Sequence, residues 1–158
     1  MANLVDTNVL VYRYDLRFPA KQEVAARLLR DSVGSENLVV PHQALVEFVA
    51  ATVRPRASLS GDSLLSRAGA YRAVEHLMEQ HPIVYPDRAV VVTAMRGAAT
   101  YQLSWYDAHL WAYAEVYGLD ELFTEDFEHG RRYGSVRVHD PFLAAADEVH
   151  ELPGLYES

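Results

Sequence analysis

The chain has no cysteine among its 158 residues and a single lysine, Lys21. The lack of cysteine excludes disulfides, thiolate zinc sites, iron–sulfur clusters and a cysteine nucleophile. Basic residues are also few, because 22 acidic residues face 14 basic ones and give a formal net charge of −8. The surface as a whole therefore does not favour nucleic acid, although a local patch can still bind it.

Long apolar runs and several well-known motifs are missing as well. No apolar stretch is long enough to span a bilayer, and the first residues show no basic region followed by an apolar run. We therefore expect a cytoplasmic protein with no membrane partner. The absence of a Walker A loop, a Gly-x-Gly-x-x-Gly turn and a Gly-x-Ser-x-Gly elbow argues against P-loop, Rossmann and serine-hydrolase chemistry.

What the chain does contain is a regular alternation of short apolar segments and helical patterns. Half of the residues are apolar and 23% are charged, which suits one folded domain. The pattern predicts strands at 3–5, 38–40, 82–85, 121–124 and 135–139. It predicts helices from residue 7, from 19, at 43–53, from 60 or 62 to 78, from 87 or 88 to 101, and at 104–117. This alternation indicates an α/β fold with a parallel sheet covered on both faces.

Four carboxylates come from well-separated segments that such a sheet brings together. Asp6 and Asp126 follow predicted strands, Asp107 lies in the first turn of a helix, and Glu47 lies one turn into another. Ligands of parallel sheets bind beyond the carboxyl ends of the strands. Bare carboxylates there would repel one another, and Mg²⁺ or Mn²⁺ would neutralise them while keeping open positions. Such an ion activates water and stabilises charge on a phosphate, which is nuclease chemistry.

Each acid also has a structural interpretation. Asp107 can complete a capping box with Ser104, Asp126 can cap a helix, and Asp6 can be a turn residue. Glu47 is harder to explain in this way because apolar residues surround it on its helix, so it faces either the core edge or a metal.

Four arginines fall in predicted loops, where they could hold a phosphate backbone or simply be solvated. They are Arg54, Arg56, Arg131 and Arg132.

Four segments of the chain resemble the PIN-domain family, and most closely its VapC-type toxins. They are Leu-Val-Asp-Thr-Asn-Val-Leu-Val-Tyr at 4–12, Val-Glu-Phe at 46–48, Ser-Trp-Tyr-Asp-Ala at 104–108 and Leu-Phe-Thr-Glu-Asp-Phe-Glu-His-Gly at 122–130. Their order and spacing agree with the family from residue 4 to Phe142.

The resemblance implies a three-layer α/β/α domain with a short parallel sheet over residues 1–142, followed by a tail of 143–158. It implies a Mg²⁺- or Mn²⁺-dependent endoribonuclease, the toxin of a toxin–antitoxin pair. The expected partners are an RNA substrate, a second copy in a homodimer, and an antitoxin that blocks the acidic cleft. The alternative is a catalytically inactive PIN fold that serves as an RNA-binding or interaction module.

The resemblance also implies roles for the four acids. Asp6 and Asp107 would bind metal, and Glu47 would bind metal or orient the attacking water. Asp126 would bind a second metal directly or through water, and we take it rather than its neighbour Glu125. The residues expected to orient these carboxylates are Thr7, Asn8, Ser104 and Thr124.

Overall fold

The computed structural model describes residues 1–144, so most of the expected tail, from residue 145 on, lies outside the described residues. The elements in chain order are β1 (Asn3–Val5), α1 (Thr7–Tyr12), α2 (Pro19–Asp31), β2 (Leu38–Pro41), α3 (His42–Val53), a short 3₁₀ helix η1 (Ala57–Leu59), α4 (Arg67–Gln80), β3 (Ile83–Val84), α5 (Arg88–Tyr101), α6 (Trp105–Tyr117), β4 (Glu121–Phe123), β5 (Arg132–Tyr133) and β6 (Val136–His139).

The strands form one sheet in the order β3-β2-β1-β4-β6-β5. All neighbouring pairs are parallel except β5 and β6, which form an antiparallel hairpin at one edge. Gly134 in the connection between β5 and β6 has a φ of 61°, a left-handed conformation that suits a two-residue hairpin turn. The predicted parallel sheet is therefore confirmed, with an antiparallel edge that the sequence pattern did not indicate.

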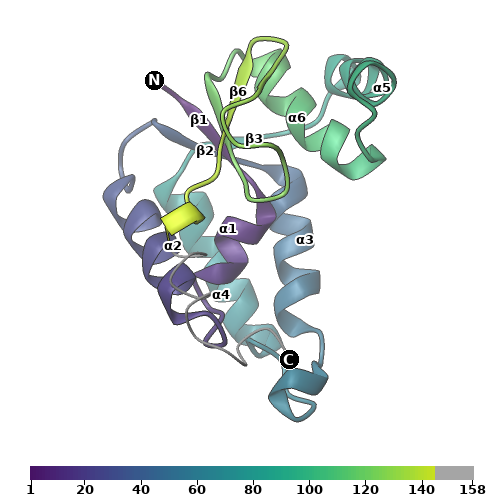
Figure 1. Ribbon diagram of the computed structural model, residues 1–158. Coiled ribbons are helices and arrows are strands. Elements are labelled where there is room, and N and C mark those ends of the chain that lie inside the picture. Colours follow the sequence, from purple (N-terminus) through teal and green to yellow (C-terminus); the bar gives the residue numbers. More distant parts are fainter. Residues whose placement is uncertain (145–158) are drawn as a thin grey trace.

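Alternating apolar residues in the strands create two cores. Leu4 and Val39 belong to a cluster with α5 and α6, whereas Val5 and Val40 belong to a cluster with α1, α2, α3 and α4. Successive strand side chains point to opposite faces, so the central strands β1, β2 and β4 contribute to both clusters. Figure 1 shows the resulting arrangement, with α5 and α6 on one side of the sheet and the other helices on the opposite side. The expected three-layer α/β/α fold is confirmed.

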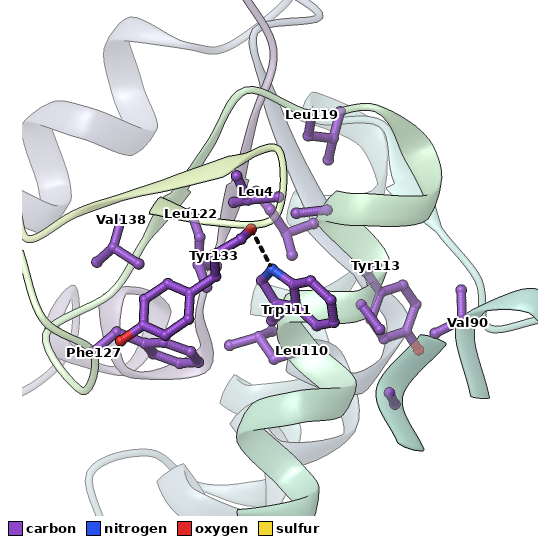
Figure 2. Packing of buried hydrophobic residues seen from close by; sticks show 14 of the residues in the cluster. Leu4, Val90, Leu110, Trp111, Tyr113, Leu119, Leu122, Phe127, Tyr133 and Val138 are labelled. Carbon is purple, nitrogen blue, oxygen red and sulfur yellow. Dashed lines mark hydrogen bonds between the residues drawn. The ribbon is translucent and has the colours of Figure 1, made fainter. Parts of the chain in front are cut away.

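Trp111 ties α6 to the β5–β6 hairpin. Its indole Nε1 donates a hydrogen bond of 2.9 Å to the carbonyl oxygen of Tyr133. The ring of Tyr101 packs edge-on against both, with centroids 5.5 Å from Trp111 and 5.2 Å from Tyr133. Figure 2 shows the bond between Trp111 and Tyr133 among the buried residues of this cluster, with Phe127 beside Tyr133. It fixes the position of α6, the helix that carries Asp107.

The N-terminal ends of two helices differ in detail from the sequence prediction. Helix α4 begins at Arg67 rather than at residue 60 or 62, because Ser66 is its N-cap and accepts a hydrogen bond of 3.0 Å from the Gly69 N–H. Helix α1 begins at Thr7 as expected, but Asp6, which the sequence indicated only as a possible turn residue, is its N-cap.

Within the described part of the chain, no helix is both long and apolar enough to cross a membrane.

The packing of α5 on α6 predicts that Gly97 accepts no side chain. A Cβ atom built on Gly97 would lie 2.3 Å from Cζ3 of Trp111. We expect Gly97→Ala to lower the free energy of unfolding by about 1–3 kcal/mol despite the higher helix propensity of alanine. Urea denaturation measures this. The matched control is Gly69→Ala, whose Cβ would meet only the movable Ser66 hydroxyl at 3.1 Å and should cost less. Equal effects at both positions would contradict the packing argument.

Candidate active site

Two adjacent parallel strands end side by side and place Asp6 next to Thr124. Val5 of β1 lies opposite Phe123 of β4, and the Asp6 N–H donates 2.9 Å to the Phe123 carbonyl oxygen. The Thr124 hydroxyl then donates 2.6 Å to Oδ2 of Asp6. The register of the sheet therefore fixes the first carboxylate of the candidate site.

The Asp6 side chain is almost fully buried and hydrogen-bonded on both oxygens. As the N-cap of α1 it accepts 2.6 Å from the Thr7 N–H, and Asn8 Nδ2 donates 3.3 Å to its other oxygen. The pKa of Asp6 is nevertheless raised from 3.8 to about 7. Burial is the largest cause, the charges of Asp126 and Asp107 act in the same direction, and the hydrogen bond from Thr124 opposes them. Its negative charge is costly until a cation compensates it.

Asn8 joins Asp6 to Asp126. The Asn8 amide donates 2.9 Å to Oδ2 of Asp126, and the Asp126 N–H donates 3.0 Å to the Thr124 hydroxyl oxygen. Desolvation raises the pKa of Asp126, and the adjacent Glu125 adds to this effect. Residues 125–130 form bends and turns, so no helix begins directly after Asp126 and its interpretation as an N-cap is wrong.

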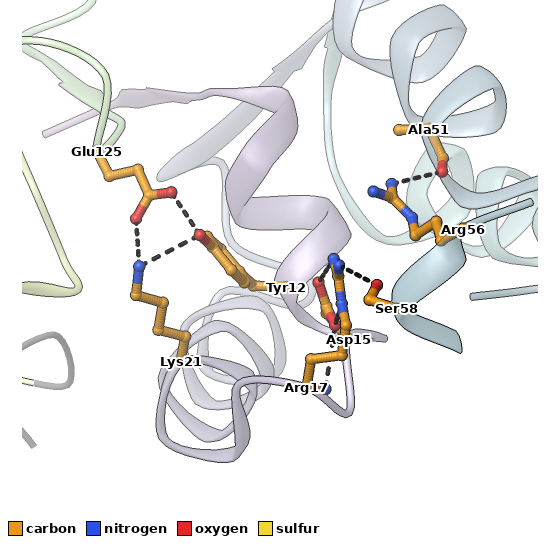
Figure 3. A network of polar contacts seen from close by, with 8 residues as sticks. All are labelled: Tyr12, Asp15, Arg17, Lys21, Ala51, Arg56, Ser58 and Glu125. Atoms are coloured by element: carbon orange, nitrogen blue, oxygen red, sulfur yellow. Dashed lines mark hydrogen bonds and ion pairs between the residues drawn. The ribbon is translucent and has the colours of Figure 1, made fainter. Parts of the chain in front are cut away.

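Glu125 is held on the other side of this segment. Its carboxylate accepts 2.5 Å from the Tyr12 hydroxyl and pairs at 2.8 Å with Nζ of Lys21. Figure 3 shows Glu125 reaching toward these two side chains, which come from α1 and α2. Burial is the main cause that raises the pKa of Tyr12, and the hydrogen bond to Glu125 is the second. The proton therefore stays on the phenol oxygen of Tyr12. Asp126 lines the candidate cleft and Glu125 does not.

Glu47 is oriented by two donors. Thr7 Oγ1 donates 2.8 Å to Oε2 of Glu47, and Gln43 Nε2 donates 2.8 Å to Oε1. The Oε1 atom of Gln43 lies 2.9 Å from Nδ1 of His109 on α6. Sequence analysis missed Gln43, although its position one turn before Glu47 on an apolar helix is a signal for a contact.

Asp107 completes the acidic set from α6. The Asp107 N–H donates 3.2 Å to the Ser104 hydroxyl oxygen, so Ser104 caps the helix as expected. This cap uses the backbone of Asp107 and leaves its carboxylate available. The charge of Asp107 raises the pKa of both Asp6 and Asp126, which indicates that it lies close to both.

All four acids line one cleft of about 320 Å³, together with Thr7 and Asn8. Of the four arginines considered from the sequence, Arg56 lines this cleft. Arg54, Arg131 and Arg132 do not, and Arg132 lies in β5 rather than in a loop. Arg17 lines the cleft too, and sequence analysis missed it. Sequence reasoning therefore assembled the acidic side of the cleft and only part of its basic side.

The acidic end of the cleft suits a hard divalent cation, since four carboxylates supply oxygen ligands there. Among the described residues Asn8 Oδ1 is buried and accepts no hydrogen bond, which leaves one further oxygen unsatisfied between Asp6 and Asp126. Within residues 1–144, however, no three His, Asp or Glu side chains are close enough to form a complete metal centre. This geometry is compatible with Mg²⁺, which commonly uses one or two carboxylates and keeps several waters.

The fold and the site together define the class of this protein. It is an α/β/α domain with an acidic cleft at the carboxyl ends of strands β1 and β4. Residues 4–134 match the PIN domain family, so the chain belongs to that family. Comparison with curated protein sequences gave no significant match.

Solved structures with the same fold come from toxin–antitoxin systems. The DNA-bound VapBC of Salmonella typhimurium superimposes with a TM-score of 0.65 and 14% sequence identity. A toxin–antitoxin complex from Klebsiella pneumoniae superimposes with a TM-score of 0.60 and 17% sequence identity. Each of the two comparisons covers 89% of this chain and 98% of the other chain. VapC20 of Mycobacterium tuberculosis, a toxin that cleaves the sarcin–ricin loop, gives 0.57 and 16%, covering 79% of this chain and 92% of the toxin.

The raised pKa of Asp6 predicts how stability depends on pH in the absence of metal. Between pH 4 and 7 the folded state binds a proton that the unfolded state has lost, so the free energy of unfolding falls as pH rises through this window. Asp6→Asn removes this fall in the free energy of unfolding, because asparagine does not titrate. We expect the variant to match the wild type near pH 4 and to exceed its stability by about 2–4 kcal/mol above pH 7.

Urea denaturation in chelator at several pH values measures the difference. Asp62→Asn, at an exposed loop position, controls for the change in net charge. A stability difference between Asp6→Asn and the wild type that stays constant from pH 4 to 8 would contradict the buried-charge account.

Proposed function

We propose that the chain is a Mg²⁺- or Mn²⁺-dependent endoribonuclease and the toxin of a toxin–antitoxin pair. One observation carries the proposal: four carboxylates from four separate segments line a single cleft in a PIN-family fold. A cleft of this kind has a strong negative potential, which a divalent ion compensates and a phosphate then approaches. Membership of the family and the fold shared with VapC toxins support the reaction class.

The residues of the cleft would divide the work as follows. Asp6 and Asp107 would hold the metal, which supplies an activated water and neutralises charge on the phosphate when bound. Glu47, fixed by Thr7 and Gln43, would orient the attacking water. Asp126 would bind a second ion directly or through water. Thr124 and Asn8 would keep Asp6 and Asp126 at a fixed separation, because each contacts both acids.

We further propose that residues 1–142 form the nuclease domain, that it acts in the cytoplasm, and that an antitoxin occupies the cleft. A homodimer is part of this proposal. Large apolar side chains are exposed on the side of α3 and α6 that adjoins the cleft, namely Val46, Trp105 and Tyr106. Burying them against a second copy would remove apolar area from water, and light scattering of the purified chain measures the mass directly.

The experiment that tests the enzymatic function is cleavage of total bacterial RNA by the purified chain with Mn²⁺, with Mg²⁺ and with chelator. We expect discrete fragments that require the metal and that disappear in Asp107→Asn. This substitution keeps the backbone N–H that Ser104 caps, so the fold should persist. Mapping the fragment ends would identify the RNA.

The absence of both cleavage and metal binding would favour the inactive interaction module instead, whereas metal binding without cleavage would point to an absent substrate or a co-purified inhibitor. Fragments that persist in Asp107→Asn would indicate a contaminating nuclease.

A second prediction separates Asp126 from Glu125. We expect Asp126→Asn to weaken Mn²⁺ binding about tenfold, because it removes a charge from the cleft. Glu125→Gln should change Mn²⁺ affinity less, since this side chain lies outside the cleft and its single amide oxygen can still accept a hydrogen bond from Tyr12 or Lys21. Isothermal titration calorimetry measures both. A larger loss in Glu125→Gln than in Asp126→Asn would reverse the assignment.

A further inference from the structure

The candidate cleft has a basic end that the acidic site does not explain. Arg17 and Arg56 line the same cleft as the four carboxylates. Arg17 lies in the connection between α1 and α2, and Arg56 lies after α3, so two loops bring these guanidinium groups together. On a chain with a net charge of −8, two arginines in one cleft form a local basic patch.

Arg17 is fixed by an internal carboxylate. Its Nε and Nη2 atoms donate 2.9 and 2.7 Å to the two oxygens of Asp15, which is almost fully buried. Its Nη1 atom donates 2.9 Å to the hydroxyl of Ser58, in the segment that carries Arg56 (Figure 3). The bidentate pair compensates the charge of Arg17 and ties the two loops together.

Arg56, in contrast, forms no salt bridge with any residue in the described part of the chain. Its Nη2 donates 2.8 Å to the carbonyl oxygen of Ala51, and its Nε is buried without a hydrogen-bond partner among residues 1–144. Burial and the nearby charges of Arg17 and Arg54 lower the pKa of Arg56, and the charge of Asp15 opposes them only in part. Arg56 therefore has no carboxylate in direct contact within the described residues, and an anion in the cleft would stabilise its charge.

Hydrogen bonds hold the backbone of Arg56 in place, so its side chain extends from an ordered segment of the chain. The Arg56 N–H donates 3.0 Å to the Asp62 carbonyl oxygen, and the Arg56 carbonyl oxygen accepts from the N–H groups of Leu59 and Gly61 at 3.1 and 2.9 Å. A preorganised guanidinium loses little entropy when it binds an anion, and its planar fork matches two oxygens of a phosphate.

We propose that Arg56, with Arg17 beside it, binds a backbone phosphate of the RNA strand next to the phosphate that the acidic end cleaves. The inference rests on the proposed function, since it assumes that an RNA strand lies in the cleft. In this arrangement a divalent ion at the carboxylates would contact the phosphate that is cleaved, and the Arg56 guanidinium would contact the next phosphate of the RNA strand.

The test measures binding rather than cleavage. A fluorescent single-stranded oligouridine is titrated with the protein in Ca²⁺, a hard oxygen-seeking ion, over about 50 to 200 mM KCl. We expect Arg56→Gln to weaken binding about tenfold and to reduce the slope of log Kd against log salt by about 0.7, the value for one phosphate contact in a single strand. Arg96→Gln, an exposed position on α5 outside the cleft, makes the same charge change and should leave the slope unchanged.

Equal effects of Arg56→Gln and Arg96→Gln would overturn the proposal, because general charge would then explain binding. If Arg56→Gln does not fold, the same binding experiment with Arg56→Lys tests the proposal instead. It should keep the salt slope and lose about threefold in affinity, since lysine lacks the fork. Wild-type affinity in Arg56→Lys would overturn the proposal.

Two further outcomes separate this inference from the proposed function. Metal-dependent RNA cleavage together with wild-type RNA binding in Arg56→Gln would leave the nuclease in place and reject the phosphate site. Loss of binding to a polyglutamate peptide, with RNA binding unchanged, would reject RNA and assign Arg56 to an acidic protein segment.

Discussion

The candidate site depends on one buried charge, the carboxylate of Asp6. The register of β1 against β4 places it beside Thr124, and the start of α1 supplies the Thr7 N–H and the Asn8 amide. These donors orient the carboxylate but do not offset its burial, because its pKa is still raised to about 7. A chain that only had to fold would gain by replacing this residue, so its burial supports the divalent ion that we propose for the cleft.

Much of this could be predicted from the sequence because it follows from local patterns. Strands with apolar runs and helices with caps are set by near neighbours, as the helix closed by Ser104 and Gly118 illustrates. Acids that directly follow predicted strands must lie at the carboxyl edge of a parallel sheet. Asp6 was therefore placed correctly without coordinates. Glu47 was placed by its apolar neighbours, which leave few sites for a charge.

The features that sequence analysis missed depend on contacts between distant segments. Strand β5 has two residues and pairs only with β6, so no periodicity marks it. The choice between Glu125 and Asp126 turns on Tyr12 and Lys21, which lie more than a hundred positions away along the chain. Arg17 reaches the cleft because Asp15, a near neighbour in the chain, and Ser58, a distant one, both hold it there, and the contact with Ser58 leaves no local signal.

The distribution of charge explains why binding and chemistry would be coupled in this molecule. With a net charge of −8 and four carboxylates in the cleft, the chain repels a polyanion over most of its surface. A divalent ion removes part of that repulsion at the place where cleavage is proposed, and Arg56 offers the one guanidinium of the cleft that has no carboxylate partner among residues 1–144. Lys21 contributes indirectly, because its pair with Glu125 offsets part of a negative charge that still raises the pKa of Asp126. An RNA strand would therefore bind well only when the metal is present, and Arg56 would position the strand in the cleft without reading its sequence.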